Sequence, residues 1–329
     1  MRVFLAVFLF VRAAVFAVQT DFDVAVIGSS PVCLLEAISH IAKNERVLIL
    51  EADPRLGGAW KAIDMCGVHN VDLGCHLIGG DVRLKSFFES YFGCAFTCLQ
   101  HPGSQFNDNH LRCSNGFYFA GGCQELISRL QGFIERSRNA QVLHRNVESV
   151  YFDPGREFVE VSLGDARYSA SKLYMPQMAH FRVENSAFPN QQLPKHHYYH
   201  LYFMVEDTGP SRFTYMNGIA SGMSRAMNLT PFAEMPRPGL QLIVIQTHNV
   251  NELKESQKFL EAFKSKGLLS PDARIVESES CTYSQLQMNT SQLQQTGGSL
   301  IEVLDTSSFG GMVRYLDRWK SSMSPHQGN

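Results

Sequence analysis

The sequence lacks a net charge of either sign, a long uninterrupted apolar run and any internal repeat. With 29 basic and 31 acidic residues, the formal net charge is only −2, so the composition provides no basic surface for a nucleic-acid partner. The most apolar stretch, residues 3–18, is interrupted by Arg12. It is shorter than the roughly 20 apolar residues that a membrane-spanning helix needs. The sequence therefore predicts no nucleic-acid partner and gives no clear membrane span.

Residues 1–20 form an apolar N-terminal extension or a signal. Arg2 precedes the apolar run and small residues lie near its end, as in a secretory signal. A predicted core strand starts at Asp23, however, which leaves almost no mature N-terminus before it. Glycosylation sequons such as the one at Asn228 are too common by chance to favour secretion. We therefore expect a cytoplasmic protein, with secretion or weak membrane association through residues 3–18 as the alternatives.

The eight cysteines do not have the paired spacing of a zinc site. Cys94 and Cys98 are the only close pair, and no matching histidine or cysteine pair lies nearby in the sequence. His196 and His200 share one face of a predicted strand, but no carboxylate or cysteine nearby completes a ligand set. We predict no metal site.

The N-terminal part of the chain has the order strand, turn, helix, strand, acid. An apolar run at residues 24–27 stops at Gly28, residues 34–43 carry apolar side chains at helical spacing, and a second apolar run at 47–50 ends in Glu51. A right-handed crossover points the helix N-terminus at the crevice beyond the strands, where a pyrophosphate is favoured. Glu51 follows Gly28 by 23 residues, near the spacing at which a carboxylate reaches a ribose hydroxyl pair. This acid favours an unphosphorylated ribose, as in FAD or NAD.

The glycine fingerprint of this turn is incomplete. Gly28 supplies the tight turn, but Ser30 stands where a second glycine lets phosphate approach the backbone, and Cys33 where a third lets helix and strand pack closely. A serine hydroxyl can donate to a phosphate, and cysteine is small and apolar. We therefore place Gly28, Ser29, Ser30 and Pro31 at a pyrophosphate, and the alternative is a strand-helix-strand unit whose crevice is empty.

Residues 53–60, DPRLGGAW, resemble the second glycine motif of the FAD-dependent amine oxidoreductases. That group includes monoamine oxidases, protoporphyrinogen oxidases and, more distantly, UDP-galactopyranose mutases. In it an acid ends the second strand and a Gly-Gly pair lets the chain pass close to the cofactor. Ala59 stands here where a basic residue usually follows the pair, and Lys61 lies two places on. The resemblance implies FAD, with contacts from Glu51, Ala52, Gly57, Gly58, Ala59 and Trp60.

Three later segments follow the order of the same family. Residues 71–78, VDLGCHLI, resemble the segment beside the flavin, which implies that His76 touches the isoalloxazine or the substrate; the alternative is a histidine that hydrogen-bonds a carbonyl. A glycine pair opening a helix and then a strand over 142–151 imply that Val147 pairs its backbone with the adenine. The C-terminal segment has the order strand, glycine pair, helix, which implies that a helix N-terminus points at the flavin through Gly310, Gly311 and Met312. The alternative is a plain structural helix.

Residues 195–204, KHHYYHLYFM, alternate in type, so one strand face carries His196, Tyr198, His200 and Tyr202. In this position the family has a sheet whose face covers the flavin, and these side chains would offer stacking area with polar tips. The alternative is that the aromatic residues are core and the histidines exposed. The residues predicted to carry chemistry are Trp60, His76, Tyr198 and His200.

The sequence thus predicts an α/β protein: a Rossmann-like FAD/NAD(P)-binding domain with an inserted substrate domain of antiparallel β-sheet plus helices. The cofactor domain is expected over residues 21–80, 115–180 and 290–329, and the substrate domain over 81–114 and 181–289. The implied function is an FAD-dependent oxidoreductase of amine-oxidase type, which transfers a hydride from a small or medium organic substrate to flavin. The alternatives are a non-catalytic flavin-fold protein and a UDP-galactopyranose-mutase-like flavoenzyme. An NAD-only protein is disfavoured because no second glycine fingerprint exists.

Overall fold

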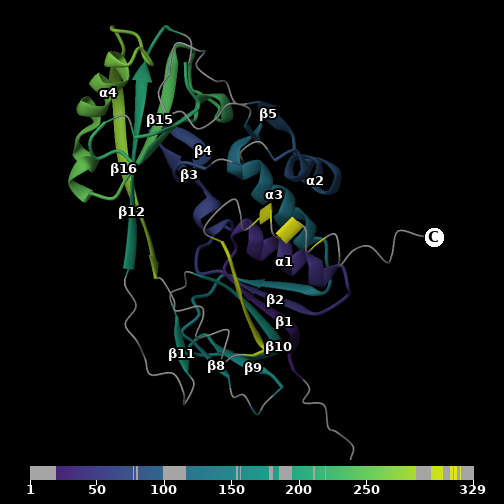
Figure 1. The fold of residues 1–329 in the computed structure, drawn as a ribbon. Coiled ribbons are helices and arrows are strands. Elements are labelled where there is room, and N and C mark those ends of the chain that lie inside the picture. Colours follow the sequence, from purple (N-terminus) through teal and green to yellow (C-terminus); the bar gives the residue numbers. More distant parts are fainter. Residues whose placement is uncertain are drawn as a thin grey trace, which may run out of the picture.

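The computed structural model has a mixed α/β fold with two main sheets, one of eight strands and one of five (Figure 1). The apolar run at residues 3–18 and the predicted cofactor residues Gly310 and Gly311 lie outside the residues that the structure describes. The described residues are 20–76, 78, 81–98, 116–152, 155, 157–177, 181–184, 195–209, 212–218, 220–286, 298–306, 312–313, 315–316 and 319.

A parallel pair of strands joined by a helix forms the centre of the larger sheet. Its elements are β1 (Phe22–Ile27), α1 (Pro31–Ile41) and β2 (Val47–Leu50). The register pairs Val24 with Val47 and Ile27 with Leu50, which confirms the predicted pair of adjacent parallel strands. All 11 residues of α1 are buried, because the helix lies between the sheet and a second helix, α3 (Gly122–Glu135) (Figure 1).

Three further parallel strands extend this pair. They are β7 (Ala140–Leu143), β10 (Arg167–Pro176) and β17 (Ile301–Leu304). β7 pairs with β2, β10 pairs with β1, and β17 pairs with β10, all in parallel. Their carboxyl ends therefore meet at one edge of the sheet, which is where open α/β sheets bind ligands.

Antiparallel strands continue the sheet beyond β10. They are β8 (Ser149–Phe152), β9 (Val159–Ser162) and β11 (Arg182–Glu184), the last of which runs parallel to β8. β9 and β10 form a hairpin around residues 164–165, where Gly164 and Asp165 separate two strand-like runs of the sequence. Residues 142–151, predicted as one strand, are instead divided between β7 and β8. The polar, exposed residues 144–146 interrupt the apolar alternation, so the buried Val147 lies in the connection and not in a strand.

The five-stranded sheet is antiparallel throughout and uses both faces for packing. In spatial order its strands are β13 (Tyr215–Asn217), β14 (Arg225–Asn228), β15 (Leu240–Thr247), β12 (Lys195–Glu206) and β16 (Arg274–Leu286). Helix α4 (Ser256–Ser265) covers one face with Phe259, Leu260 and Phe263. On the opposite face, Tyr202 and Val244 join the core that surrounds α1.

The remaining described elements are short hairpins and helices. They are η1 (Gly58–Trp60), β3 (Ala62–Met65), β4 (Val68–Asp72), α2 (Val82–Phe92), β5 (Phe96–Cys98), β6 (Phe117–Phe119), η2 (Thr230–Phe232) and η3 (Val250–Lys254). No helix in the described part of the chain is long and apolar enough to cross a membrane. The predicted division into two domains, and the membrane association of residues 3–18, stay predictions.

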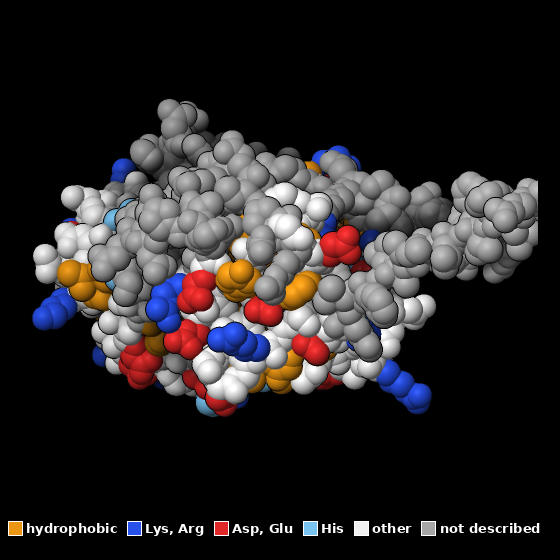
Figure 2. Space-filling model, turned by 90° about the horizontal axis from the view of Figure 1, so that it is seen from below, with side chains coloured by type: hydrophobic (Ala, Val, Ile, Leu, Met, Phe, Trp, Pro, Cys, Tyr) orange, Lys and Arg blue, Asp and Glu red, His pale blue; other side chains and the backbone are white. Residues whose placement is uncertain are grey.

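Figure 2 shows the face of the molecule that lies below the larger sheet in Figure 1. On the described part of this face, basic and acidic side chains lie next to one another, and the apolar ones form small groups between them. Such a mixed surface agrees with the near-zero net charge of the sequence.

A buried histidine fixes α1 to the sheet. His40 Nε2 lies 3.2 Å from Glu36 Oε1 and 3.0 Å from the hydroxyl of Tyr174 on β10, and its Nδ1 contacts Glu45. His40, Glu36 and Tyr174 are all less than 10% exposed. Buried polar groups are costly unless they are paired, so this network ties the C-terminal half of α1 to the sheet.

Replacing His40 should therefore destabilise the fold. We expect His40→Ala to lower the free energy of unfolding by about 2–4 kcal/mol, because it removes a partner from two carboxylates and a hydroxyl at once. The measurement is urea unfolding of both proteins. His69→Ala is the matched control: this side chain is 82% exposed, and its loss should cost less than about 0.5 kcal/mol. Equal costs for the two variants would contradict the role given to His40.

Candidate functional site

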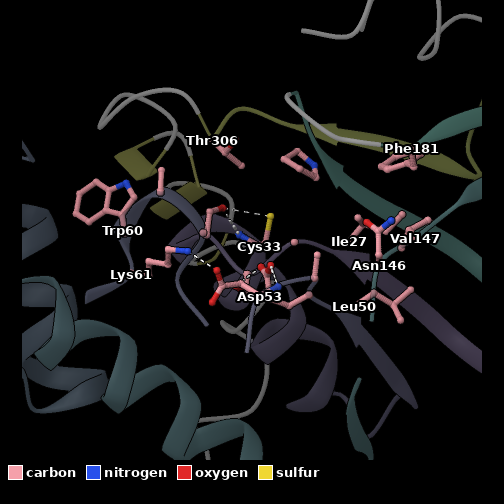
Figure 3. Close-up of a pocket in the computed structure, with 18 of the residues that line it drawn as sticks. Ile27, Cys33, Leu50, Asp53, Trp60, Lys61, Asn146, Val147, Phe181 and Thr306 are labelled. Atoms are coloured by element: carbon pink, nitrogen blue, oxygen red, sulfur yellow. Dashed lines mark hydrogen bonds and ion pairs between the residues drawn. The ribbon is translucent and has the colours of Figure 1, made fainter. Parts of the chain in front are cut away.

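A cavity of about 430 Å³ lies at the carboxyl ends of β1 and β2, where α1 begins (Figure 3). Most of the residues predicted to bind a cofactor come together here, although they lie far apart in the sequence. Those that line the cavity are Gly28, Ser29, Ser30, Glu51, Ala52, Gly58, Ala59, Trp60 and Val147. Pro31 and Gly57 are not among the lining residues, but each is adjacent in the chain to one that is.

The first turn leads directly from β1 into α1. Gly28 has φ of +82°, a conformation that residues with a side chain rarely adopt. Ser30 is the N-cap of α1: its Oγ accepts a hydrogen bond from the Cys33 N–H at 3.4 Å and donates to Cys33 Sγ at 3.2 Å. Burial raises the pKa of the Cys33 thiol to about 12, so this group is a neutral thiol. The serine and cysteine that replace two glycines thus bond to each other at the helix start.

Glu51 is held by the turns around it. One carboxylate oxygen accepts a hydrogen bond from the Ser29 hydroxyl, and the other accepts from the Asp53 N–H at 2.9 Å. The same Ser29 hydroxyl accepts from the Gly57 N–H at 2.8 Å. Ser29 is fully buried and Glu51 is 9% exposed. Each carboxylate oxygen can accept a second hydrogen bond, so Glu51 can still receive hydroxyl groups from a ligand.

The Gly-Gly turn passes close to the first turn. A Cβ on Gly58 would lie 3.3 Å from the Ser30 nitrogen, and one on Gly57 would lie 2.8 Å from the Lys61 backbone. Both glycines have positive φ, +57° for Gly58 and +122° for Gly57. A side chain at Gly57 would collide with the backbone of Lys61, and one at Gly58 would be strained and tightly packed against Ser30. The glycine pair therefore lets two distant turns approach each other at the cavity wall.

The two ends of the cavity differ in character. Figure 3 shows Val147, Asn146 and Phe181 at one end and Trp60 with Lys61 at the other. The sequence interpretation did not place Asn146, Phe181 or Tyr283 of β16 at the site. The signal for Asn146 was its position in the connection that follows the parallel strand β7. Tyr283 comes from another sheet and has no local signal.

His76 braces the wall behind Trp60 and does not line the cavity. Its Nε2–H donates to the carbonyl oxygens of Ala59, at 2.7 Å, and Leu73, at 2.9 Å, and its ring stacks on Trp60 with centroids 4.6 Å apart. Burial lowers the pKa of His76 to about 4. The imidazole is therefore neutral, with its proton on Nε2 and its lone pair on Nδ1. The geometry is that of the alternative given above, a histidine that hydrogen-bonds a carbonyl. His76 nevertheless supports Trp60, which does line the cavity.

Three described side chains on the predicted aromatic face of β12, Tyr198, His200 and Tyr202, do not line the cavity either. The Tyr202 hydroxyl accepts from the Gly74 N–H at 2.6 Å and donates to the Asp72 carbonyl at 2.8 Å. A Cβ on Gly74 would lie 2.6 Å from His200 Nε2, so the histidine ring packs directly against that backbone. Tyr198 lies beside His248, with ring centroids 5.9 Å apart. Tyr202 and His200 therefore join β12 to residues 72–74, whereas Tyr198 packs on His248.

Other predicted sites lie elsewhere in the fold. Met312 is buried in the core around α1 and is not a lining residue. Asn228 is fully buried, and its side-chain amide donates to Gln241 at 2.8 Å, so the folded protein does not present this sequon to a glycosyltransferase. No group of three potential metal ligands comes together within the described ranges.

Comparison with known proteins finds no matching family and no matching curated protein. The structure is similar to reduced UDP-galactopyranose mutase, with a TM-score of 0.63 at 10% sequence identity over 92% of this chain and 98% of the other. It is similar to putrescine oxidase bound to putrescine, with a TM-score of 0.60 at 12% identity over 91% and 98% of the two chains. It is also similar to cyclohexylamine oxidase from Brevibacterium oxydans, with a TM-score of 0.60 at 11% identity over 92% and 98%. At such low identity the likeness establishes the fold alone, and it confirms the FAD-dependent amine-oxidase-like fold that the motifs predicted.

The buried His200 should make the stability of the fold depend on pH. It is 5% exposed, its Nδ1 has no hydrogen-bond partner among the described residues, and burial lowers its pKa to about 4. An unfolded histidine has a pKa near 6.5, so the unfolded state binds the proton more readily and stability is lost as pH falls from about 6.5 toward 4.

The free energy of unfolding of the wild type should fall between pH 7 and pH 4.5. We expect this fall to be about 2 kcal/mol smaller in His200→Phe, which keeps an aromatic ring but cannot take up the proton. Urea unfolding at both pH values measures the effect. The matched control is His197→Phe. His197 is exposed and lies three residues earlier on β12, on the opposite strand face, so this variant should keep the wild-type pH dependence. A wild-type slope in His200→Phe would show that this histidine does not titrate in the expected range.

Proposed function

We propose that this protein, whose fold is that of the FAD-dependent amine oxidases, binds FAD in the cavity and acts as a flavin-dependent oxidoreductase. One observation carries the proposal: the turns at Gly28–Ser30 and Gly57–Trp60 meet at one cavity, with Glu51 between them and Val147 opposite. These positions combine the chemistry that a dinucleotide needs, namely close backbone approach, a carboxylate and an apolar end.

The residues present fit the adenosine half of FAD. Gly58 and Ser30 both line the cavity, and a Cβ on Gly58 would approach the Ser30 nitrogen to 3.3 Å, so the backbones of the two turns lie close together at the cavity wall. Val147 and Phe181 at the far end of the cavity offer apolar surface to an adenine ring. The remaining lone pairs of Glu51 would accept the ribose hydroxyls, and its charge would repel a 2′-phosphate. The ligand would therefore be FAD in preference to a dinucleotide that carries a 2′-phosphate on its ribose.

Bound FAD would supply the hydride acceptor, which no protein side chain provides. The chain's own contribution would be binding, orientation and exclusion of water. Trp60 is 8% exposed and lines the end opposite Val147, and His76 stacks behind it while its Nε2–H holds Ala59 and Leu73 in place. Because the pKa of His76 is lowered to about 4, this residue would stay neutral at physiological pH. It would position Trp60 and would not transfer a proton to the substrate.

The FAD proposal predicts binding that depends on Glu51. Wild-type protein should be stabilised by FAD, by about 2.7 kcal/mol at a concentration one hundred times Kd. Glu51→Gln preserves the shape and one acceptor oxygen but removes the charge, so FAD binding should weaken by about 10- to 100-fold. Flavin fluorescence titration measures both. Glu135→Gln on the exposed end of α3 should bind like the wild type, and a wild-type protein that neither binds FAD nor gains stability would refute the proposal.

The type of activity is the finer part of the proposal. We infer oxidation of a small or medium organic amine, since two of the similar folds are amine oxidases. The FAD-loaded protein should be mixed anaerobically with a panel of primary and secondary amines. A substrate amine should reduce the bound flavin, so that its visible absorbance falls nearly to that of the reduced form. Loaded protein that stays oxidised with every amine, yet is reduced by dithionite, would favour the alternative of a non-catalytic flavin-fold protein.

A further inference from the structure

The start of α1 offers few hydrogen-bond donors to an anion. Its first residue, Pro31, has no N–H, and the Cys33 N–H is already bonded to the Ser30 hydroxyl. The Ser30 hydroxyl also donates to Cys33 Sγ. A pyrophosphate placed there would carry two negative charges, so the cavity needs a cation beyond the helix dipole.

Lys61 is in position to supply that cation. It follows η1 directly and lines the cavity, where its ammonium pairs with the Asp53 carboxylate. In Figure 3 Lys61 points toward Asp53 at the end of the cavity that carries Trp60, away from Val147. Cys33, in the first turn of α1, lines the same cavity. The other cation that lines the cavity, Arg145, is paired with Asp165, whose side chain is 70% exposed.

The backbone fixes where Lys61 begins. A Cβ on Gly57 would come within 2.8 Å of both the nitrogen and the Cα of Lys61, so the Gly-Gly turn packs directly on this residue. The side chain is 20% exposed and that of Asp53 is 33% exposed. The backbone of Lys61 is therefore fixed at the cavity wall, whereas its flexible four-carbon side chain can move the ammonium to a new partner.

We propose that Lys61 binds the pyrophosphate of the dinucleotide, and that Asp53 holds its ammonium in the cavity until the ligand arrives. This inference rests on the proposed binding of FAD and names the residue that compensates the phosphate charge. A pyrophosphate offers two negative charges against one on the carboxylate, so Lys61 gains by changing partner. Asp53 keeps the Arg55 N–H, which donates to it at 2.9 Å, and its exposed oxygen is then solvated by water.

The test compares variants of the ion pair. Lys61→Gln should weaken FAD binding by about 10- to 100-fold, because it removes a charge-assisted contact. Lys61→Arg should restore most of the affinity, and Asp53→Asn should bind FAD several-fold more tightly than the wild type because the competing charge is gone. In the Lys61→Gln background, Asp53→Asn should have a smaller effect, which a double-mutant cycle measures. Lys85→Gln is the control, since Lys85 pairs with Glu89 on α2, and it should bind FAD like the wild type.

Truncated ligands separate the phosphate contact from a general change of the cavity. Titration with ADP should show the same loss in Lys61→Gln as FAD does, whereas adenosine should bind both proteins equally. Equal FAD affinity in wild type and Lys61→Gln would overturn the role of Lys61 and leave the FAD proposal standing. An equal loss for adenosine and ADP would overturn it as well, because the effect would then be structural. Wild-type protein that binds neither FAD nor ADP would overturn both proposals together.

Discussion

The geometry of the cavity depends on one buried hydroxyl group. Ser29 donates to Glu51 and accepts from the Gly57 N–H, while the other oxygen of Glu51 accepts from the Asp53 N–H. The turn after β1 is thereby fixed to both ends of the segment that connects β2 to η1. A carboxyl group that is only 9% exposed would be costly to bury without these hydrogen-bond partners. The position of Glu51 toward the cavity is thus a consequence of Ser29 and not of Glu51 alone.

A second set of buried contacts supports the wall behind Trp60. The Asp72 carboxylate accepts from the Cys123 N–H at 2.8 Å and from the Tyr118 hydroxyl, which ties β4 to the start of α3. Burial raises the pKa of this carboxyl group. From the other side, Tyr202 bonds to the Asp72 carbonyl and the Gly74 N–H. The five-stranded sheet therefore supports the candidate site by holding residues 72–74, and it contributes Tyr283 to the cavity lining.

The sequence allowed prediction of those parts that depend on local order. The parallel pair β1 and β2, the hairpin of β9 and β10, and the position of Glu51 all follow from apolar runs, turns and spacing. The role of Ser29 could not be predicted, because its partners are 22 and 28 residues away. Alternation placed Tyr202 and His200 on one face, but it cannot tell whether that face meets a ligand or the backbone of residues 72–76. In the structure, Tyr202 and His200 pack against the backbone of residues 72–74.

The incomplete glycine fingerprint does not by itself argue for a lost site. Cys33 Sγ lies 4.0 Å from where a Gly28 Cβ would be, so a thiol fills the space that a third glycine would leave open for close packing. Ser30 caps the helix that a second glycine would leave uncapped, at the cost of donors that a phosphate could use. What the substitutions change is the balance of charge. If a dinucleotide binds as proposed, its affinity would depend on a cation outside the first turn, and Lys61 lines the same cavity.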